Sequence, residues 1–171
     1  MTADKHTDAN KLNGAKSHQS QSHLPILERK YPDISGTLLA FDFGEKRIGV
    51  AVGETLLKVA YPVAIIQADT NDAKFAQIAD LIKEWRPSLL VVGLPTHMDG
   101  TEHAITHLAK KFAQRLEGRF NLPVTMIDER LTSAEAAQHL HAAGIKSAKQ
   151  KSLLDAVAAQ SILQSYFESH F

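Results

Sequence analysis

Alternating apolar and polar segments along the chain predict an α/β domain that starts after a polar stretch of about 35 residues. Two apolar runs, at residues 37–43 and 47–53, flank a short turn at 44–46. They are predicted to form a β-hairpin in which Gly44 adopts a positive φ. The first run is apolar on both faces, which is typical of a central strand. A third strand at 61–66, with Pro62 near its start, would complete an antiparallel meander.

Apolar residues at helical spacing separate two further strands. The predicted order is a helix at 71–85, a strand at 88–92, a helix at 101–120, a strand at 123–127, a helix from 132 to 144, and a last helix at 152–167. Asn71 or Asp72 is expected to cap the first of these helices. In the second, Ile105, Leu108, Phe112 and Leu116 are expected to face the sheet.

This order predicts an α/β fold with a mixed five-stranded sheet, flanked by helices on both faces. A three-stranded antiparallel meander would be joined by two parallel strands. The carboxyl ends of the first, fourth and fifth strands would then converge at the edge where α/β sheets usually bind ligands.

Composition favours a single domain at 36–171 after a flexible polar tail at 1–35, because the tail has too few apolar residues to offset its ordering entropy. The 171 residues include no cysteine, which excludes disulfides and a thiolate nucleophile. No secretory h-region and no membrane-length apolar run is present, so a soluble cytoplasmic protein is expected. The 19 basic and 19 acidic residues balance, so any nucleic acid would be held by local patches.

Asp42 interrupts the first apolar run just before the turn. A buried carboxylate without a partner costs several kcal/mol or takes up a proton. A cationic group is therefore expected against Asp42: a metal ion, a neighbouring Lys or Arg, or a row of backbone N–H groups.

Asp155 is a second acid in apolar surroundings. It shares a helical stripe with Ala158, Ala159 and Ile162, which should face the sheet, and the small alanines would let the helix approach until Asp155 meets Asp42. Alternatively, Asp155 lies in the first turn after Ser152 and stabilises the helix N-terminus.

Asp128 and Glu129 follow the fifth strand as a third acidic position. If the alternation of the strand persists, the two side chains point to opposite faces and only one enters the site. Three acids at separate strand or helix ends are what a two-metal phosphoryl-transfer site requires, in which one ion activates water and the other stabilises the leaving oxygen.

Four ordered segments carry a family resemblance: FDFGEKRIGVAVG at 41–53, VVGLPTHMDGTE at 91–102, DERLTSAEA at 128–136 and LLDAVAAQSILQSYF at 153–167. With them the chain resembles the bacterial pre-16S ribosomal RNA nucleases of the YqgF, or Holliday-junction-resolvase-like, family. The resemblance implies an RNase H-like fold and Mg²⁺-dependent phosphodiester hydrolysis, with Mn²⁺ as a possible substitute. It implies the 5′ region of pre-16S rRNA, or a pre-ribosomal particle, as the substrate and partner.

The resemblance also assigns residues. Asp42 corresponds to the family's first-strand acid and Asp155 to its last-helix acid, and either Glu129 or Asp128 is the middle acid, with Glu129 favoured. The expected metal ligands are therefore Asp42, Glu129 and Asp155. Contacts to the nucleic acid are expected from Lys46, Arg47, Arg130 and a basic patch of Lys146, Lys149 and Lys151. Lys46, Arg47 and Arg130 alternatively pair structurally with the acids.

Other functions remain open from the residues alone. Branched DNA is a second substrate class, suggested by resolvases at superfamily level. A non-catalytic RNA-binding or ribosome-associated factor would use the same basic residues. The hairpin also resembles the phosphate-binding turn of actin-type and sugar-kinase ATP-binding proteins, but those need two such domains. A monomer or weak homodimer is expected.

Overall fold

The computed structural model describes residues 34–97, 99–129 and 148–171, with side chains in the last segment from residue 153 onward. Several predictions lie outside these residues: the polar N-terminal tail, the helix at 132–144, Arg130 and Lys146. For Lys149 and Lys151 only the backbone is described.

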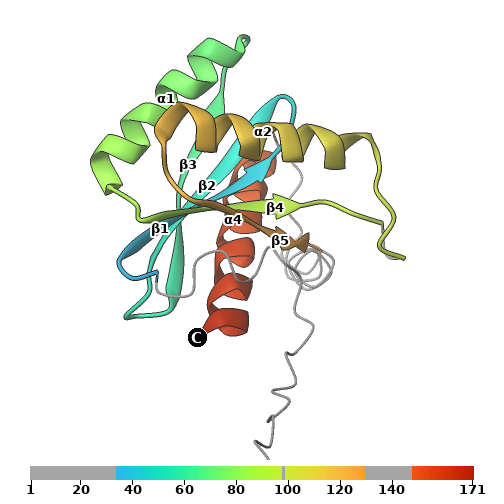
Figure 1. Ribbon diagram of the computed structural model, residues 1–171. Coiled ribbons are helices and arrows are strands. Elements are labelled where there is room, and N and C mark those ends of the chain that lie inside the picture. The colour runs from blue at the N-terminus through green and yellow to red at the C-terminus, as the bar shows by residue number, and fades with distance from the viewer. Residues whose placement is uncertain (1–33, 98, 130–147) are drawn as a thin grey trace, which may run out of the picture.

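The order of elements along the chain is β1 (Thr37–Phe43), β2 (Arg47–Glu54), β3 (Val59–Gln67), α1 (Asn71–Trp85), β4 (Leu89–Leu94), α2 (Ala104–Phe120), β5 (Val124–Asp128) and α4 (Ala148–His170). The strands form one sheet in the order β3-β2-β1-β4-β5 (Figure 1). β1 pairs with β2 and β2 with β3 in antiparallel fashion, whereas β4 is parallel to both β1 and β5. The predicted meander with two parallel strands is confirmed.

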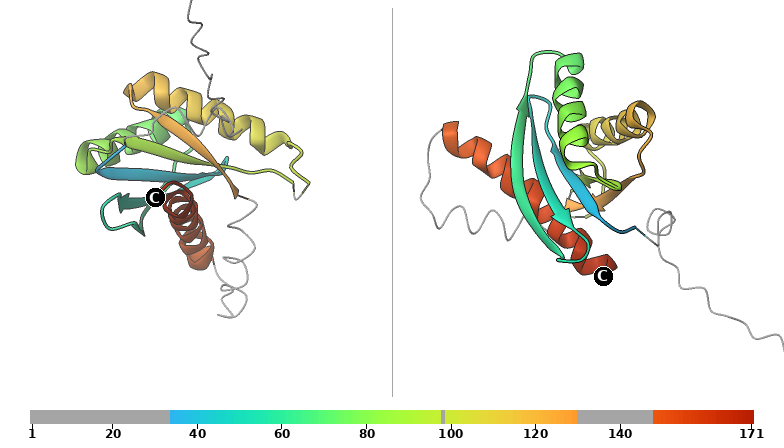
Figure 2. Two further views of the ribbon diagram at one scale, coloured as in Figure 1. Left: turned by 60° about the horizontal axis from the view of Figure 1, so that its bottom comes forward. Right: turned by 90° about the vertical axis from the view of Figure 1, so that its left-hand side faces the viewer.

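Three layers make up the domain. Figure 2 shows α4 on one face of the sheet and α1 and α2 on the other. Side chains along β1 point alternately to the two faces of the sheet. Leu39 and Phe41 lie in the core under α1 and α2, and Leu38 and Ala40 lie in the core under α4. All four are fully buried, as expected of a central strand covered on both sides.

The first helix is capped one residue earlier than predicted. Thr70 is the N-cap in an extended conformation, and its hydroxyl accepts a 3.2 Å hydrogen bond from the Ala73 N–H. The prediction of Asn71 or Asp72 was wrong because Thr is also a favourable N-cap residue and Asn71 is already helical. Arg86 ends the helix in the left-handed conformation, directly before Pro87.

The buried face of α2 is rotated from the predicted one. Its buried residues are Thr106, Ala109, Phe112, Ala113 and Leu116. Leu108 is 36% exposed and Ile105 is only half-buried, so the prediction was wrong for these two. Thr106 takes part in the buried face because its hydroxyl donates to the Pro95 carbonyl and accepts from the His103 N–H at 3.1 Å. The Thr106 hydroxyl thus has both a donor and an acceptor partner within the protein, so this polar residue can occupy a core position.

The described part of α4 begins at Ala148, before the predicted start at residue 152. Asp155 is therefore about two turns inside the helix, and the alternative that it stabilises the helix N-terminus was wrong. The face against the sheet consists of Ala156, Ala159, Ile162, Leu163, Tyr166 and Phe167, whereas Ala158 is half-exposed. None of the helices in the described parts of the chain has the length and apolar character needed to cross a membrane.

Candidate active site

Asp42 lies near the carboxyl end of β1 on the face that α4 covers. It follows Leu38 and Ala40 at two-residue spacing, and both of these pack in the core under α4. Its partner across the hairpin is Gly49 on β2. A Cβ on Gly49 would lie 1.8 Å from the carbonyl oxygen of Asp155, a distance that no side chain tolerates. Glycine at this position therefore allows α4 to pass directly over the strand pair and brings Asp155 close to Asp42.

The turn between β1 and β2 also depends on a glycine, for a different reason than predicted. Gly44 does not adopt a positive φ, so that expectation was wrong. Instead, a Cβ on Gly44 would lie 2.6 Å from the carbonyl oxygen of Arg47. The tight return of the chain requires the missing side chain, and it places Lys46, which is exposed, at the tip of the hairpin.

Arg47 pairs with Asp155. Its Nε lies 2.9 Å from Asp155 Oδ2, and the two side chains are 21% and 25% exposed. Oδ2 itself is shielded from solvent, yet it accepts no hydrogen bond, because the N–H of Arg47 is not aligned with it. The structure thus provides the cationic neighbour of this acid, and it leaves the oxygen with capacity for a further cationic partner.

Glu129 and Asp128 point to opposite faces of the sheet, as their adjacency predicts. Ile127 packs against the core under α4, and the carboxylate of Glu129, just beyond the end of β5, lies beside Ile162 of α4 on the same face as Asp42 and Asp155. Asp128 belongs to the other face, where its Oδ1 accepts a 3.3 Å hydrogen bond from the Thr96 hydroxyl. The backbone therefore brings Glu129, and not Asp128, to the α4 side of the sheet.

Gly93 on β4 makes room for the Glu129 carboxylate. A Cβ on Gly93 would lie 2.0 Å from Glu129 Oε1 and 2.5 Å from Ile162 Cδ1 of α4. The carboxylate thus lies over β4 beside the last helix. Neither Gly49 nor Gly93 was predicted to contribute to the site. The signal that would have found both is an isolated glycine in an apolar strand, which marks a close approach of another group.

The three acids on this face interact electrostatically. Burial, followed by repulsion from Asp155, raises the pKa of Asp42 from 3.8 to about 6. Burial, followed by repulsion from Asp42 and then Asp128, raises the pKa of Glu129 from 4.5 to about 7. Asp42 therefore interacts electrostatically with two acids, Asp155 of α4 and Glu129 at the end of β5. A divalent cation would relieve this repulsion.

The acids fit a hard cation such as Mg²⁺ in donor chemistry. All three offer carboxylate oxygens, and Asp155 Oδ2 is shielded without a hydrogen bond. Within the described segments, no three His, Cys, Asp or Glu side chains are close enough together to form a metal cage. Mg²⁺ is commonly bound by one or two carboxylates, with water and substrate phosphate as its other ligands. The arrangement is compatible with that mode of binding.

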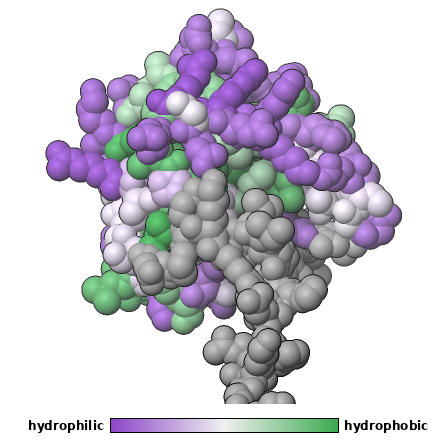
Figure 3. All heavy atoms as spheres, viewed as in Figure 1, coloured by the Kyte–Doolittle hydropathy of each residue, from purple (hydrophilic) through white to green (hydrophobic). Residues whose placement is uncertain are grey.

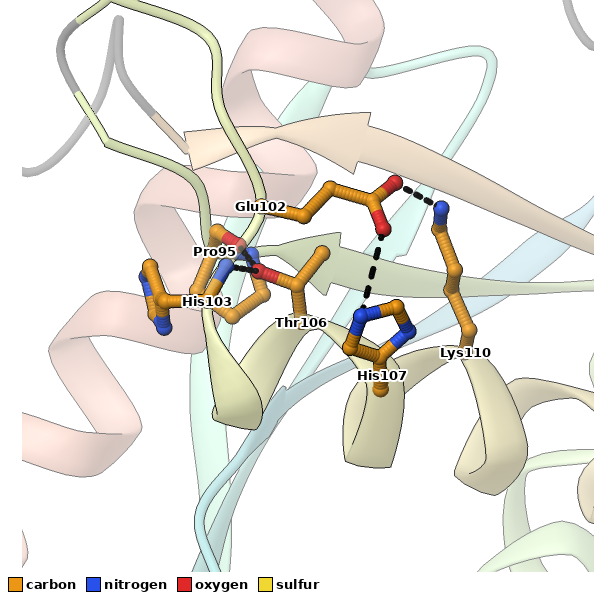
Figure 4. A network of polar contacts seen from close by, with 6 residues as sticks. All are labelled: Pro95, Glu102, His103, Thr106, His107 and Lys110. Atoms are coloured by element: carbon orange, nitrogen blue, oxygen red, sulfur yellow. Dashed lines mark hydrogen bonds and ion pairs between the residues drawn. The ribbon is translucent and has the colours of Figure 1, made fainter.

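The loop after β4 is held by contacts with α2. Figure 4 shows Glu102 between Lys110 and His107 of α2, with its carboxylate 3.7 Å from His107 Nε2. The same figure shows Thr106 joined to Pro95 and His103. These contacts tie the loop to the first turns of α2.

The chain matches one family model and many curated proteins. Residues 36–169 match the RuvX model, described as Holliday junction resolvase. A Methylobacillus flagellatus protein named "Putative pre-16S rRNA nuclease" is 64% identical over 133 residues, which cover 78% of this chain and 91% of the relative. Proteins of the same name from Dechloromonas aromatica and Neisseria meningitidis are 60% and 55% identical, and the matches cover 78% of this chain and 92% and 88% of those relatives.

Among solved structures, the fowlpox virus resolvase, determined with substrate Holliday junction DNA, has a TM-score of 0.50 at 14% sequence identity. The match covers 78% of this chain and 97% of the resolvase chain. At this identity the likeness concerns the fold, which is RNase H-like as the resemblance implied. The family model, the relatives and the fold agree with one another, and the chain belongs to the RuvX family of nucleases.

Proposed function

We propose that this protein is a metal-dependent endonuclease that hydrolyses phosphodiester bonds in RNA and processes the 5′ region of pre-16S rRNA. One observation carries the proposal: Asp42, Glu129 and Asp155 come from three separate elements to the α4 side of the sheet, and Asp42 interacts electrostatically with both others. The names of the relatives support the substrate class.

In this proposal, Asp42, Glu129 and Asp155 hold Mg²⁺ or Mn²⁺. When bound, such an ion supplies Lewis-acid stabilisation of the charge that develops on the phosphate. Arg47 orients the Asp155 carboxylate through its 2.9 Å contact. Burial and repulsion from Asp42 raise the pKa of Glu129 to about 7 in the metal-free protein, so this carboxylate has to release a proton near neutral pH before it can hold the ion. Exposed Lys46 at the hairpin tip is positioned to contact the phosphate backbone.

The test uses the purified full-length protein and a precursor RNA that carries the 5′ extension of 16S rRNA. Cleavage is expected with Mg²⁺ or Mn²⁺ and is expected to stop with EDTA. Asp42→Asn, Glu129→Gln and Asp155→Asn should each lower the rate by about 10²-fold or more, because each removes charge from the site. Asp128→Asn, on the opposite face of the sheet, is the matched control and should cost far less. Undiminished cleavage by Asp42→Asn would overturn the proposal.

A second candidate substrate is branched DNA, because the matching family model is described as Holliday junction resolvase. The same preparations should be given a synthetic four-way DNA junction. Cleavage of the junction at a higher kcat/KM than the precursor RNA would assign the site to DNA. Binding of RNA that survives EDTA, without cleavage of either substrate, would instead support a non-catalytic RNA-binding factor.

A further inference from the structure

A pocket of about 300 Å³ lies on the other side of the sheet, between α1, α2 and the turn of the β1–β2 hairpin. Phe43, Ile48 and Phe112 contribute to its apolar wall, and Lys74, Lys111 and Arg115 contribute its cations. This volume is at the lower end of the range for pockets that bind small organic ligands. Figure 3 shows hydrophilic residues spread over the upper part of the molecule, where α1 and α2 lie in Figure 1.

The two pocket cations on α2, Lys111 and Arg115, differ from the other cations of this helix in their ion pairing. Lys110 pairs with Glu102, and Arg119 lies 3.6 Å from Asp72 and over the ring of Phe75. Lys111 and Arg115 lie one turn apart on α2 and are exposed, and neither forms an ion pair with a described residue. Their charge is therefore available to an external anion.

The third cation, Lys74 of α1, is fixed by a hydrogen bond to the backbone carbonyl of Glu45 in the hairpin turn. Among the described residues that line the pocket, Glu45 is the single acidic one, and its side chain is exposed. Three cations against one carboxylate leave an excess of positive charge. This charge balance favours a phosphate-bearing ligand.

The wall of the pocket adds an apolar component. The rings of Phe43 and Phe112 are stacked, with centroids 4.9 Å apart and an interplanar angle of 29°. Leu108, 36% exposed, also lines the pocket. An apolar wall with cations beside it matches the two parts of a nucleotide, a flat base and a charged phosphate.

The pocket and the acids lie at the same end of the sheet. Asp42 and Phe43 are consecutive in β1, and strand alternation places the first on the α4 side and the second in the wall of the pocket. The turn at 44–46, with exposed Lys46, is the short path between the two faces. A strand that crosses this turn would connect them.

We propose that this pocket binds a nucleotide of the substrate strand, outside the bond that is cleaved at the acids. The inference rests on the proposed function, since it assumes that a nucleic-acid strand occupies the α4 side of the same sheet edge. The bound nucleotide would add affinity and position the strand, and the chemical step remains at the three acids.

The test measures binding without cleavage, by fluorescence anisotropy of a labelled single-stranded RNA from the 5′ region of the precursor, in EDTA. The double variant Lys111→Ala/Arg115→Ala is expected to bind about tenfold more weakly, and its salt slope should fall by about 1.4, which is about 0.7 for each lost phosphate contact. Lys111→Arg/Arg115→Lys should restore most of the affinity. Lys83→Ala, an exposed lysine in the last turn of α1, is the control.

Affinity and salt slope of the double variant equal to those of Lys83→Ala would overturn the inference. A titration with adenosine monophosphate tests a free nucleotide: binding tighter than that of the RNA, and lost in the double variant, would also overturn the assignment to a strand. The proposed function fails separately. If the wild-type protein cleaves no substrate but the double variant binds RNA more weakly, the pocket proposal stands and the nuclease proposal fails. If the wild-type protein cleaves and the double variant binds RNA with unchanged affinity, the nuclease proposal stands and the pocket proposal fails.

Discussion

Replacing Asp42 by Asn should stabilise the metal-free protein at alkaline pH. The pKa of Asp42 is raised to about 6 in the folded protein by burial and by Asp155, against an ordinary value of 3.8. The unfolded chain therefore releases this proton at lower pH than the folded one. The contribution of Asp42 to stability is fully present below pH 3.8 and is lost as the pH rises through about 6.

The size of this loss of folding free energy follows from the shift in the pKa of Asp42. At about 1.4 kcal/mol for each pH unit, the rise from 3.8 to about 6 corresponds to a loss of about 3 kcal/mol at pH 8. Asn has nearly the shape of the protonated acid and cannot ionise. Asp42→Asn is therefore expected to raise the free energy of unfolding by about 1–3 kcal/mol at pH 8 and to change it little at pH 4.

Urea unfolding in EDTA at pH 4, 6 and 8 measures this difference. Asp80→Asn is the matched control, because Asp80 is exposed on α1 and should follow the wild type at every pH. A variant that is destabilised equally at pH 4 and pH 8 would refute the reasoning. Such a result would mean that Asp42 contributes a structural hydrogen bond instead of an uncompensated charge.

The remaining predictions concern the metal, the two glycines and the pH dependence of the reaction. Mg²⁺ at ten times its Kd should raise wild-type stability at pH 8 by about 1.4 kcal/mol and leave Asp42→Asn nearly unchanged, which melting curves with and without EDTA would reveal. Gly49→Ala should cost about 3 kcal/mol or more, because its Cβ would meet the Asp155 carbonyl, whereas Gly118→Ala, with open space around it, should cost nothing in the same urea experiment. Gly93→Ala should reduce cleavage more strongly than stability, since its Cβ displaces the end of the Glu129 side chain; a loss of stability as large as that of Gly49→Ala would contradict this. Cleavage at subsaturating substrate should rise with pH up to about 7, as Glu129 loses its proton, and a flat profile between pH 5 and 7 would argue against its role.

The amino-acid sequence alone was sufficient to predict the sheet and to single out two acids, Asp42 in β1 and Asp155 in α4. Long apolar runs, helical spacing and turn residues act over a few neighbouring positions, so they identify strands and helices without knowledge of the rest of the chain. Asp42 and Asp155 were recognisable because each carries a charge in a segment that is otherwise apolar. Both also fell in segments that carry the family resemblance.

Tertiary structure decided how these elements meet. Helix α4 is already formed at Ala148, about two turns before Asp155, and this removed the helix-terminus explanation of Asp155. Glu129 rather than Asp128 lies on the α4 side because its side chain, just beyond the end of β5, occupies the space that Gly93 leaves open. The ion pair of Arg47 with Asp155 joins residues more than 100 positions apart. The pattern of apolar residues predicts which segments form helices and strands. The distance between two side chains far apart in the sequence depends on how those helices and strands pack. At this site it also depends on Gly49 and Gly93, which allow the neighbouring groups to approach.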